Sequence, residues 1–222
     1  MFEAVVFDWD GTLADTRRVV VASFQKALSD LGSNVEDEFI ERRIGVGASE
    51  TFREILRASK MRFDEALVAG LVKKKIRAEI EMSNQVNLFA GAMALLESLY
   101  GKVKLALASM NNRSFVDHML DAMDIRRFFD VVLTVDEVQK SKPNPEIFLK
   151  CALKLQSKPE RCAVVEDSIF GVQAAKAARM GCIAVLTGVY SEEELKKADP
   201  DLIVNSLEER DEILNFIFRQ TG

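Results

Sequence analysis

Residues 4–15 of the chain read AVVFDWDGTLAD, and this stretch decides the fold class. It begins with an apolar run at 4–7, and a run without polar alternation is typical of a strand buried in a parallel sheet. Two acidic residues, Asp8 and Asp10, follow the run at once, and Gly11 after them permits a sharp turn. The pattern indicates a buried strand whose carboxyl end carries carboxylates.

Similar apolar, β-branched runs recur along the chain and alternate with longer stretches of helical periodicity. This alternation predicts an α/β fold, in which right-handed crossovers connect a parallel sheet flanked by helices. For the expected helix that contains Val172, Ala175 and Ala178, Ser168 suits the N-cap and Gly181 suits the position just past the end. The expected strands span residues 4–7, 103–108, 131–135, 162–165, 183–186 and 202–204.

The segment from residue 16 to residue 90 differs from the rest because it contains no convincing β run. Its periodicity predicts an all-helical insertion into the α/β core, which residues 1–15 and 91–222 then form. The expected helices of the insertion span residues 17–31, 37–44, 49–58 and 64–82.

The composition excludes several classes of protein. The chain has 222 residues, 48% of them hydrophobic, which is enough for a sizeable core with a smaller insertion. A formal net charge of −5 gives no basic excess, so nucleic acid is not an expected partner. No apolar run approaches the length of a membrane span, and no basic segment precedes the first apolar residues. We expect a soluble cytoplasmic protein with no signal peptide and no membrane partner.

Cysteine and histidine offer little chemistry. Cys151, Cys162 and Cys182 are odd in number and lack C-x-x-C spacing, so we expect buried, reduced thiols rather than disulfides or a zinc site. The single histidine, His118, has helical spacing from its apolar neighbours and is expected on a helix surface. Chemistry that needs a histidine base is therefore not expected.

Polar residues gather in four clusters, three of them directly after expected strands and one before a later helix. Ligands of open parallel sheets bind beyond the carboxyl ends of the strands, so the four clusters together predict one site. Taken singly, each cluster has an ordinary explanation as a turn, a helix cap or a solvated loop. The clusters are DWDGT at 8–12, SMNN at 109–112, KSKP at 140–143 and EDS at 166–168.

The residue types in these clusters suit a divalent cation and a phosphate. Carboxylates are hard oxygen donors, for which Mg²⁺ is the natural metal, and the turn at Gly11 exposes N–H groups that bind anions. One carboxylate can attack phosphorus to form an aspartyl-phosphate, while a second moves the leaving-group proton. The four carboxylates are Asp8, Asp10, Glu166 and Asp167.

The motifs resemble those of the haloacid dehalogenase superfamily, in the group that contains phosphoglycolate phosphatase and β-phosphoglucomutase. The resemblance covers essentially the whole chain. It implies a Rossmann-like parallel-sheet core with a helical cap domain inserted after the first motif. The matching motifs are FDWDGTLADT at 7–16, LASMNN at 107–112, KSKPNPEIF at 140–148 and VVEDSIFGVQAA at 164–175.

This resemblance implies a catalytic role for four residues. Asp8 would be the nucleophile that accepts the phosphoryl group, and Asp10 would be the general acid and base. Ser109 would hydrogen-bond the phosphoryl group, and Lys142 would neutralise its charge and that of Asp8. Positioning and charge stabilisation are most of what phosphoryl transfer requires.

Metal and substrate contacts follow from the same resemblance. Mg²⁺ would be bound by the carboxylates of Asp8 and Asp167, by the backbone carbonyl of Asp10, and by Glu166 directly or through water. We expect substrate contacts from the turns beside the phosphate and from a loop of the cap. The expected substrate-binding residues are Gly11, Thr12, Met110, Asn111, Arg42, Arg43 and Gly45.

Several positions discriminate between branches of the superfamily. Asp10 favours phosphoryl transfer over carbon–halogen cleavage, because the dehalogenases lack a matching acid. No lysine lies between Lys26 and Lys60, where phosphonate-cleaving members carry their Schiff-base lysine. Ala48 stands where β-phosphoglucomutase carries an arginine for the distal phosphate, and Arg42 or Arg43 could replace it.

We therefore expect a Mg²⁺-dependent phosphatase that acts on a small phosphorylated metabolite through an aspartyl-phosphate. A sugar-phosphate mutase of the β-phosphoglucomutase type is one alternative. A non-enzymatic receiver that stores phosphate on an aspartate is a more distant one. The sequence identifies neither the leaving group nor the oligomeric state.

Overall fold

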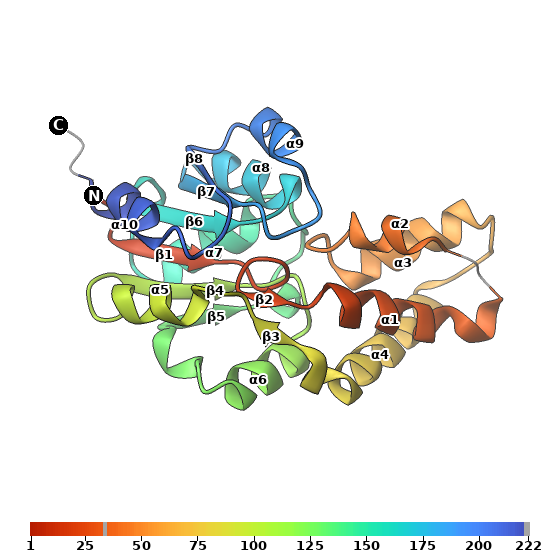
Figure 1. Ribbon diagram of the computed structural model, residues 1–222. Coiled ribbons are helices and arrows are strands. Elements are labelled where there is room, and N and C mark those ends of the chain that lie inside the picture. The colour runs from red at the N-terminus through yellow and green to blue at the C-terminus, as the bar shows by residue number, and fades with distance from the viewer. Residues whose placement is uncertain (33–34, 220–222) are drawn as a thin grey trace.

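The computed structural model describes residues 1–32 and 35–219, which form a sheet covered by helices and a group of helices beside one end of it (Figure 1). The sheet consists of β1 (Ala4–Phe7), β4 (Lys104–Ala108), β5 (Val131–Leu133), β6 (Cys162–Glu166), β7 (Gly181–Val185) and β8 (Leu202–Val204). These strands lie in the order β5-β4-β1-β6-β7-β8, and every neighbouring pair is parallel. The predicted parallel α/β sheet is confirmed.

Strand β1 lies between β4 and β6. Its four residues are completely buried and alternate between two hydrophobic cores, with Val5 and Phe7 in one and Ala4 and Val6 in the other. Such alternation follows from the period of two in a strand, and a strand covered on both faces has to be apolar throughout. The interpretation of residues 4–7 as a buried strand is confirmed.

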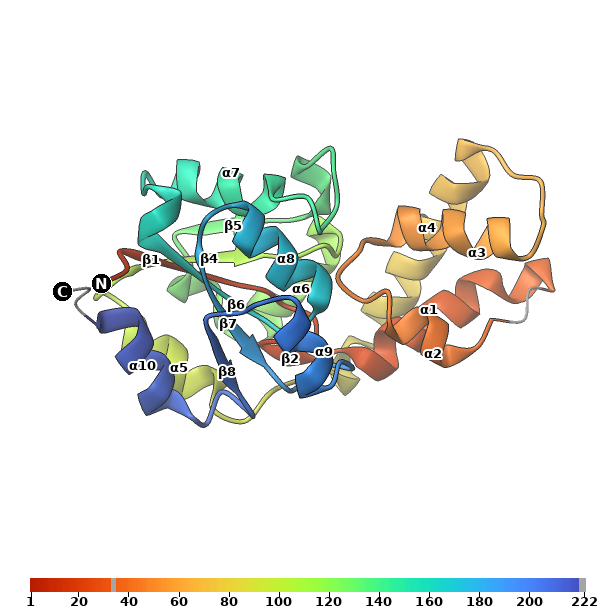
Figure 2. The same cartoon turned by 90° about the horizontal axis from the view of Figure 1, so that it is seen from above.

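Helices cover both faces of the sheet (Figure 2). They are α5 (Ala92–Leu99), α6 (Arg113–Ala122), α7 (Glu146–Lys154), α8 (Ile169–Ala177), α9 (Glu192–Lys197) and α10 (Arg210–Phe218). Buried residues of α5, α6 and α10 belong to the core that contains Val5, and those of α7, α8 and α9 belong to the core that contains Val6. Three short 3₁₀ helices connect the larger elements, namely η3 (Arg126–Phe128), η4 (Val135–Glu137) and η5 (Pro159–Arg161).

The remaining helices pack on one another and are called the helical unit below. They are α1 (Arg17–Leu28), η1 (Ser29–Leu31), α2 (Asp37–Glu41), α3 (Ala48–Ala58), α4 (Glu65–Glu81) and η2 (Ser83–Gln85). The helical unit has a hydrophobic core of its own, in which the ring centroids of Phe24 and Phe52 lie 4.6 Å apart. Figures 1 and 2 both show it beyond the end of the sheet at which β1 stops.

Two elements at the edges of the helical unit differ from the sequence prediction. The second expected helix ends at Glu41 rather than at residue 44, and the chain turns through Gly45, which has a φ of 92°. A two-residue strand, β3 (Asn87–Leu88), pairs antiparallel with β2 (Ala14–Asp15) where the chain leaves the α/β part and returns to it. Strands this short carry no measurable periodicity, which is why the sequence did not indicate them.

The predicted boundaries of α8 are correct at one end and wrong at the other. Ser168 caps the helix, since its Oγ accepts a hydrogen bond from the Gly171 N–H at 3.0 Å. Gly181 does not follow the helix end, because Arg179 takes the left-handed conformation there with a φ of 59°. Gly181 instead begins β7, where a Cβ atom would lie 2.4 Å from the ring of Phe2.

The predicted burial of the cysteines and the predicted position of His118 on a helix surface are confirmed. All three cysteines are free and buried. His118 is exposed on α6 and its ring Nε2 lies 2.9 Å from Ser83 Oγ. Among residues 1–32 and 35–219, no helix combines the length and the apolar character that a membrane crossing requires.

Candidate active site

The carboxyl ends of three neighbouring strands bring the predicted residues together. The sheet order places β1 between β4 and β6, so Asp8 after β1, Ser109 after β4 and Asp167 after β6 share one edge. Backbone hydrogen bonds extend the ladder beyond the strands, from Asp8 N–H to Val165 O at 3.0 Å and from Ser109 N–H to Leu133 O at 3.0 Å. The sheet therefore fixes the backbone from which these side chains project.

Lys142 is the central cation of the site. Its Nζ lies 2.6 Å from Asp8 Oδ1 and 2.6 Å from Glu166 Oε1, and its side chain is fully buried. Burial would lower the pKa of Lys142, but the carboxylates of Asp8 and Glu166 outweigh burial and raise it. The loop that carries Lys142 is anchored by Glu146, whose carboxylate accepts the backbone N–H of Gln139 and of Lys140.

Lys142 contacts two of three buried carboxylates that lie together. Oxygen atoms of Asp8, Glu166 and Asp167 lie within 4.8 Å of one another. Burial raises the pKa of Asp8 well above its ordinary value, Lys142 opposes that shift, and Glu166 adds to it. Burial, followed by Glu166 and Asp8, likewise raises the pKa of Asp167. One ammonium does not balance three carboxylates, so the cluster has surplus negative charge that a cation would neutralise.

The surroundings of Asp167 fit a divalent cation. A Cβ atom on Gly11 would lie 2.3 Å from Asp167 Oδ2, and one on Gly188 would lie 2.0 Å from the same oxygen. Glycine at both positions therefore keeps the space around Asp167 Oδ2 open. The other oxygen, Asp167 Oδ1, accepts a hydrogen bond from Thr12 Oγ1 at 3.0 Å. A set of carboxylate oxygens without nitrogen or sulfur ligands is the donor set that Mg²⁺ prefers.

Glu166 is held by its own loop. Its Oε2 accepts hydrogen bonds from the backbone N–H groups of Asp167 and Ser168 and from Ser168 Oγ, each at 3.0 Å. Gly171 permits this arrangement, since a Cβ atom there would lie 1.8 Å from Glu166 Cδ. Both oxygens of Glu166 thus have protein partners, and the residue positions Lys142.

Asp10 has different partners from Asp8. Its Oδ1 accepts from Thr16 Oγ1 at 2.8 Å, and its Oδ2 lies 3.4 Å from the donor Ser109 Oγ. Asn111 Nδ2 donates to Asp10 Oδ1 at 3.5 Å. The two carboxylates therefore occupy separate hydrogen-bond networks although they are two positions apart.

Three further predicted residues, Gly11, Met110 and Asn111, lie in the loops that follow β1 and β4. Gly11 has a φ of 87°, and its carbonyl accepts a hydrogen bond from Thr187 Oγ1 at 2.6 Å. Met110 is buried and follows Ser109, whose Oγ accepts the Asn111 N–H at 3.0 Å. The structure thus brings the predicted residues of all four clusters to one edge of the sheet.

The predicted residues of the helical unit behave differently from one another. Gly45 approaches the α/β part, since a Cβ atom there would lie 3.4 Å from Ser168 Oγ. Arg42 instead forms an ion pair with Glu194, its Nη2 lying 2.5 Å from Glu194 Oε1. Arg43 forms an ion pair with Glu54. Neither arginine pairs with Asp8, Asp10, Glu166 or Asp167 in the described part of the chain.

Two buried residues that the sequence interpretation missed also reach this region. Lys75 and Glu79 of α4 have side chains that are 4% and 0% exposed, and Lys75 Nζ donates to Asn111 Oδ1 at 3.1 Å. The available signal was their position on α4, because they continue the buried stripe of Val68 and Leu71 at helical spacing.

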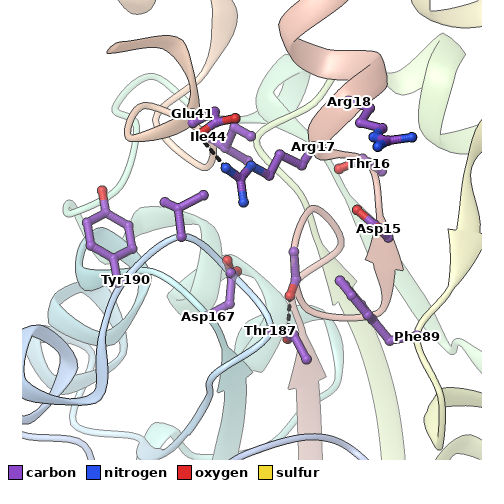
Figure 3. Close-up of a pocket in the computed structure, with 13 residues that line it drawn as sticks. Asp15, Thr16, Arg17, Arg18, Glu41, Ile44, Phe89, Asp167, Thr187 and Tyr190 are labelled. Carbon is purple, nitrogen blue, oxygen red and sulfur yellow. Dashed lines mark hydrogen bonds and ion pairs between the residues drawn. The ribbon is translucent and has the colours of Figure 1, made fainter. Parts of the chain in front are cut away.

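Two cavities open toward the site. One, of about 420 Å³, is lined by Gly11, Asp167 and Tyr190, and Figure 3 shows Asp167 directed into it while Arg17 pairs with Glu41 above. The other, of about 750 Å³, is lined by Gly47 of the helical unit and reaches Lys142. Small molecules therefore have space to approach the carboxylates from between the two parts of the chain.

Comparison with known families decides the class of protein. Residues 5–185 match the profile of the haloacid dehalogenase-like hydrolase family. The chain belongs to this family. The match includes all four clusters of the site, and it confirms the predicted superfamily and its Rossmann-type fold.

Among named relatives, the chain is 31% identical over 180 residues to a phosphorylated carbohydrates phosphatase of Thermotoga maritima, covering 79% of this chain and 81% of that protein. It is 27% identical to the fructose-1-phosphate phosphatase YqaB of Escherichia coli, covering 83% of this chain and 96% of the relative. A crystal structure of β-phosphoglucomutase from Clostridium difficile is similar, with a TM-score of 0.83, 26% identity and coverage of 96% and 99% of the two chains. This haloacid dehalogenase-like protein is therefore an enzyme, and phosphatases are among its relatives.

Proposed function

We propose that this enzyme is a Mg²⁺-dependent phosphatase that hydrolyses a small phosphorylated metabolite through an aspartyl-phosphate on Asp8. The observation that carries the proposal is the separation of the two aspartates, with Asp8 beside Lys142 and Asp10 beside Ser109 and Thr16. The names of the phosphatase relatives support the reaction class, and two of those names specify phosphorylated sugars.

The residues that would hold Mg²⁺ are Asp8, Asp167, the backbone carbonyl of Asp10 and, directly or through water, Glu166. When bound, the ion would neutralise the acidic cluster and polarise the phosphate. Lys142 neutralises negative charge on Asp8, because its ammonium lies 2.6 Å from Asp8 Oδ1.

In the first step, an Asp8 oxygen forms a bond to phosphorus and the bond from phosphorus to the leaving oxygen breaks. Asp10 gives its proton to that oxygen, and Ser109 donates a hydrogen bond to the transferring phosphoryl group. In the second step, Asp10 takes a proton from water, the water oxygen attacks the phosphorus, and Asp8 is released with inorganic phosphate.

We also propose that residues 16–90 act as a cap domain on a core made of residues 1–15 and 91–222. Gly45 and Gly47 of the helical unit lie against Ser168 and Ser141, so this loop closes the region beside the catalytic cluster. Closure of such a unit excludes bulk water and contributes residues that select the substrate.

The test is a screen of phosphorylated metabolites with Mg²⁺ and with EDTA, in which released phosphate is measured. We expect phosphate release with Mg²⁺ and its loss in EDTA. Equal rates in EDTA would contradict the metal assignment.

The alternative of a sugar-phosphate mutase is kept because of the similarity to the β-phosphoglucomutase structure. A mutase would require an added sugar bisphosphate and would return phosphate to the sugar instead of releasing it. A phosphoenzyme that persists without releasing phosphate would favour the receiver alternative.

A further inference from the structure

The Lys75–Glu79 pair of α4 has no part in the mechanism above, although it lies beside Asp10. Lys75 Nζ is 2.5 Å from Glu79 Oε1. Asn111 connects the pair to the α/β part, since its Nδ2 donates to Glu79 Oε1 at 3.2 Å and to Asp10 Oδ1 at 3.5 Å. One side chain therefore separates a buried ion pair of the helical unit from the proposed proton donor.

Lys75, Asn111 and Asp10 line a small cavity, and Glu79 lies behind Lys75 without lining it. Because Asp10 is the proposed proton donor, the leaving group would depart on this side of the site. The cavity has a volume of about 20 Å³, which is room for about one water molecule. This volume is too small for a leaving group, so the helical unit has to shift from the sheet to admit one, which would then lie between Lys75 of α4 and Asn111 of the α/β part. The polar lining residues are Asp10, Lys75, Asn111, Arg43 and Thr51, and the rest of the lining is glycine or apolar residues such as Val20 and Phe24.

Lys75, Arg43 and Arg17 at this side each have a carboxylate partner. Lys75 is paired with Glu79 and its Nζ lies 5.4 Å from the centroid of the Phe24 ring. Arg43, which also lines this cavity, is paired with Glu54. In the neighbouring 420 Å³ cavity, Arg17 is paired with Glu41. Arg18 also lines that cavity, but Figure 3 shows its side chain extending away from Asp167.

Burial of the Glu79 carboxylate lowers the free energy of unfolding. Its side chain is completely buried, and its Oε2 has no hydrogen-bond partner within residues 1–32 and 35–219. Buried ion pairs contribute little net stability compared with apolar residues of similar volume. A lysine alone at this position would attract an anionic leaving group, and the carboxylate 2.5 Å away cancels that attraction.

We propose that Glu79 sets leaving-group specificity by neutralising Lys75, so that the enzyme prefers monophosphates of uncharged alcohols over esters whose leaving group carries a second anionic group. This inference rests on the proposed phosphatase function and adds the charge of the substrate class. Glu79 acts through Lys75 and is a specificity-determining residue rather than a catalytic one.

The test compares two esters that differ in one group. 2-Hydroxyethyl phosphate and phosphoglycolate share a two-carbon leaving group, which ends in a hydroxymethyl group in the first and a carboxylate in the second. We expect the native protein with Mg²⁺ to favour the uncharged ester in kcat/KM by about tenfold or more. Glu79→Gln keeps the shape but leaves the Lys75 charge uncancelled, and it should reduce that ratio by about tenfold.

Two further variants separate specificity from structure. Glu81→Gln makes the same charge change on the same helix, where Glu81 pairs with Lys26 and Arg77 away from the site, and the ratio should stay at the native value. The double variant Lys75→Met/Glu79→Gln removes both charges and should restore the native ratio. If the pair had only a structural role, Glu79→Gln would keep the native kcat/KM ratio. Alternatively, the double variant would change the ratio as much as Glu79→Gln does.

Hydrolysis of p-nitrophenyl phosphate tests the proposed function separately. If the native protein hydrolyses none of the three esters, the phosphatase proposal fails and this inference fails with it. If it is active but favours phosphoglycolate, or if Glu79→Gln keeps the native ratio, only the inference is overturned. Where an ester turns over too slowly to measure, its inhibition constant against p-nitrophenyl phosphate gives its affinity, and the ratio of the two esters' affinities should change in the same direction in Glu79→Gln.

Discussion

At the scale of single residues, the difference between Asp8 and Asp10 comes from what each side chain touches. Asp8 shares Lys142 with Glu166, whereas Asp10 accepts a hydrogen bond from Thr16. Trp9 between them is completely buried in the same core as Phe7, so the turn is anchored by an apolar ring while both carboxylates project toward the site.

Asp8→Asn should abolish phosphate release, because an amide cannot form the phosphorus–oxygen bond. We expect a loss of at least about 10³-fold in kcat with the fold retained, measured by phosphate release and thermal unfolding. The control is Asp124→Asn in an exposed turn, which should leave kcat unchanged. Native-like turnover by Asp8→Asn would exclude Asp8 as the nucleophile.

Asp10→Asn should slow steady turnover by about 10²- to 10⁴-fold, since general acid–base help is lost. p-Nitrophenol is a good leaving group and needs little protonation, so the first step should survive better than the hydrolysis of the phosphoenzyme. A stopped-flow trace should therefore show a burst of about one equivalent followed by a slow phase. Steady release at the native rate would contradict a proton-transfer role for Asp10.

Gly11→Ala should weaken metal binding through Asp167. Gly11 has a φ of 87°, and the added Cβ would lie 2.3 Å from Asp167 Oδ2. We expect the Mg²⁺ concentration at half-maximal activity to rise by about tenfold or more. Gly101→Ala is the matched control, because Gly101 has a φ of 72° but nothing within 4 Å of an added Cβ. An equal effect in both variants would attribute the loss to backbone strain.

At the scale of elements, the sequence predicts those helices and strands whose hydrophobic pattern is long enough to detect. β1 was predictable because four consecutive apolar residues directly precede a polar cluster. β2 and β3 were not, because each has only two residues and depends on the other for its hydrogen bonds. Lys75 and Glu79 were missed for a different reason: charges on a helix indicate a solvated face, and only tertiary packing buries them.

The N-cap of α8 links helix stability to Lys142. Ser168 caps the helix and also donates from its Oγ to Glu166 Oε2 at 3.0 Å. Ser168→Ala should lower the free energy of unfolding by about 1 kcal/mol and should also lower kcat, because Glu166 would hold Lys142 less firmly. Urea denaturation and phosphate release measure the two effects.

Ser191→Ala removes the N-cap of α9 and is the control for this prediction. This variant should lower the free energy of unfolding by a similar amount without lowering kcat. In the described part of the chain, the only side chain that hydrogen-bonds Ser191 is that of Glu194, which is not part of the proposed site. A fall of kcat in Ser191→Ala equal to that in Ser168→Ala would contradict a specific link between the α8 cap and Lys142.

At the scale of the whole molecule, Arg42 joins the helical unit to the α/β part on the side of α9. Arg42 Nη2 lies 2.5 Å from Glu194 Oε1, and its guanidinium lies 4.9 Å from the centroid of the Tyr190 ring. Tyr190 OH also donates to Arg42 O at 2.7 Å. A backbone hydrogen bond from Ser191, together with Arg42, lowers the pKa of Glu194 to about 2, so the ion pair persists at neutral pH.

A double-mutant cycle on Arg42 and Glu194 tests whether this contact holds the helical unit against the sheet. Arg42→Met and Glu194→Gln should each raise KM by about two- to fivefold, as expected for a partly exposed ion pair, and the double variant should be no worse than the larger single effect. Glutamine at position 194 retains the capping interactions with Ser191. The control is Glu192→Gln on the same helix, which removes an ion pair with Lys196 and should leave KM unchanged. Additive effects would show that the two residues act independently, and an unchanged KM in all variants would place closure elsewhere, at Gly45 and Gly47.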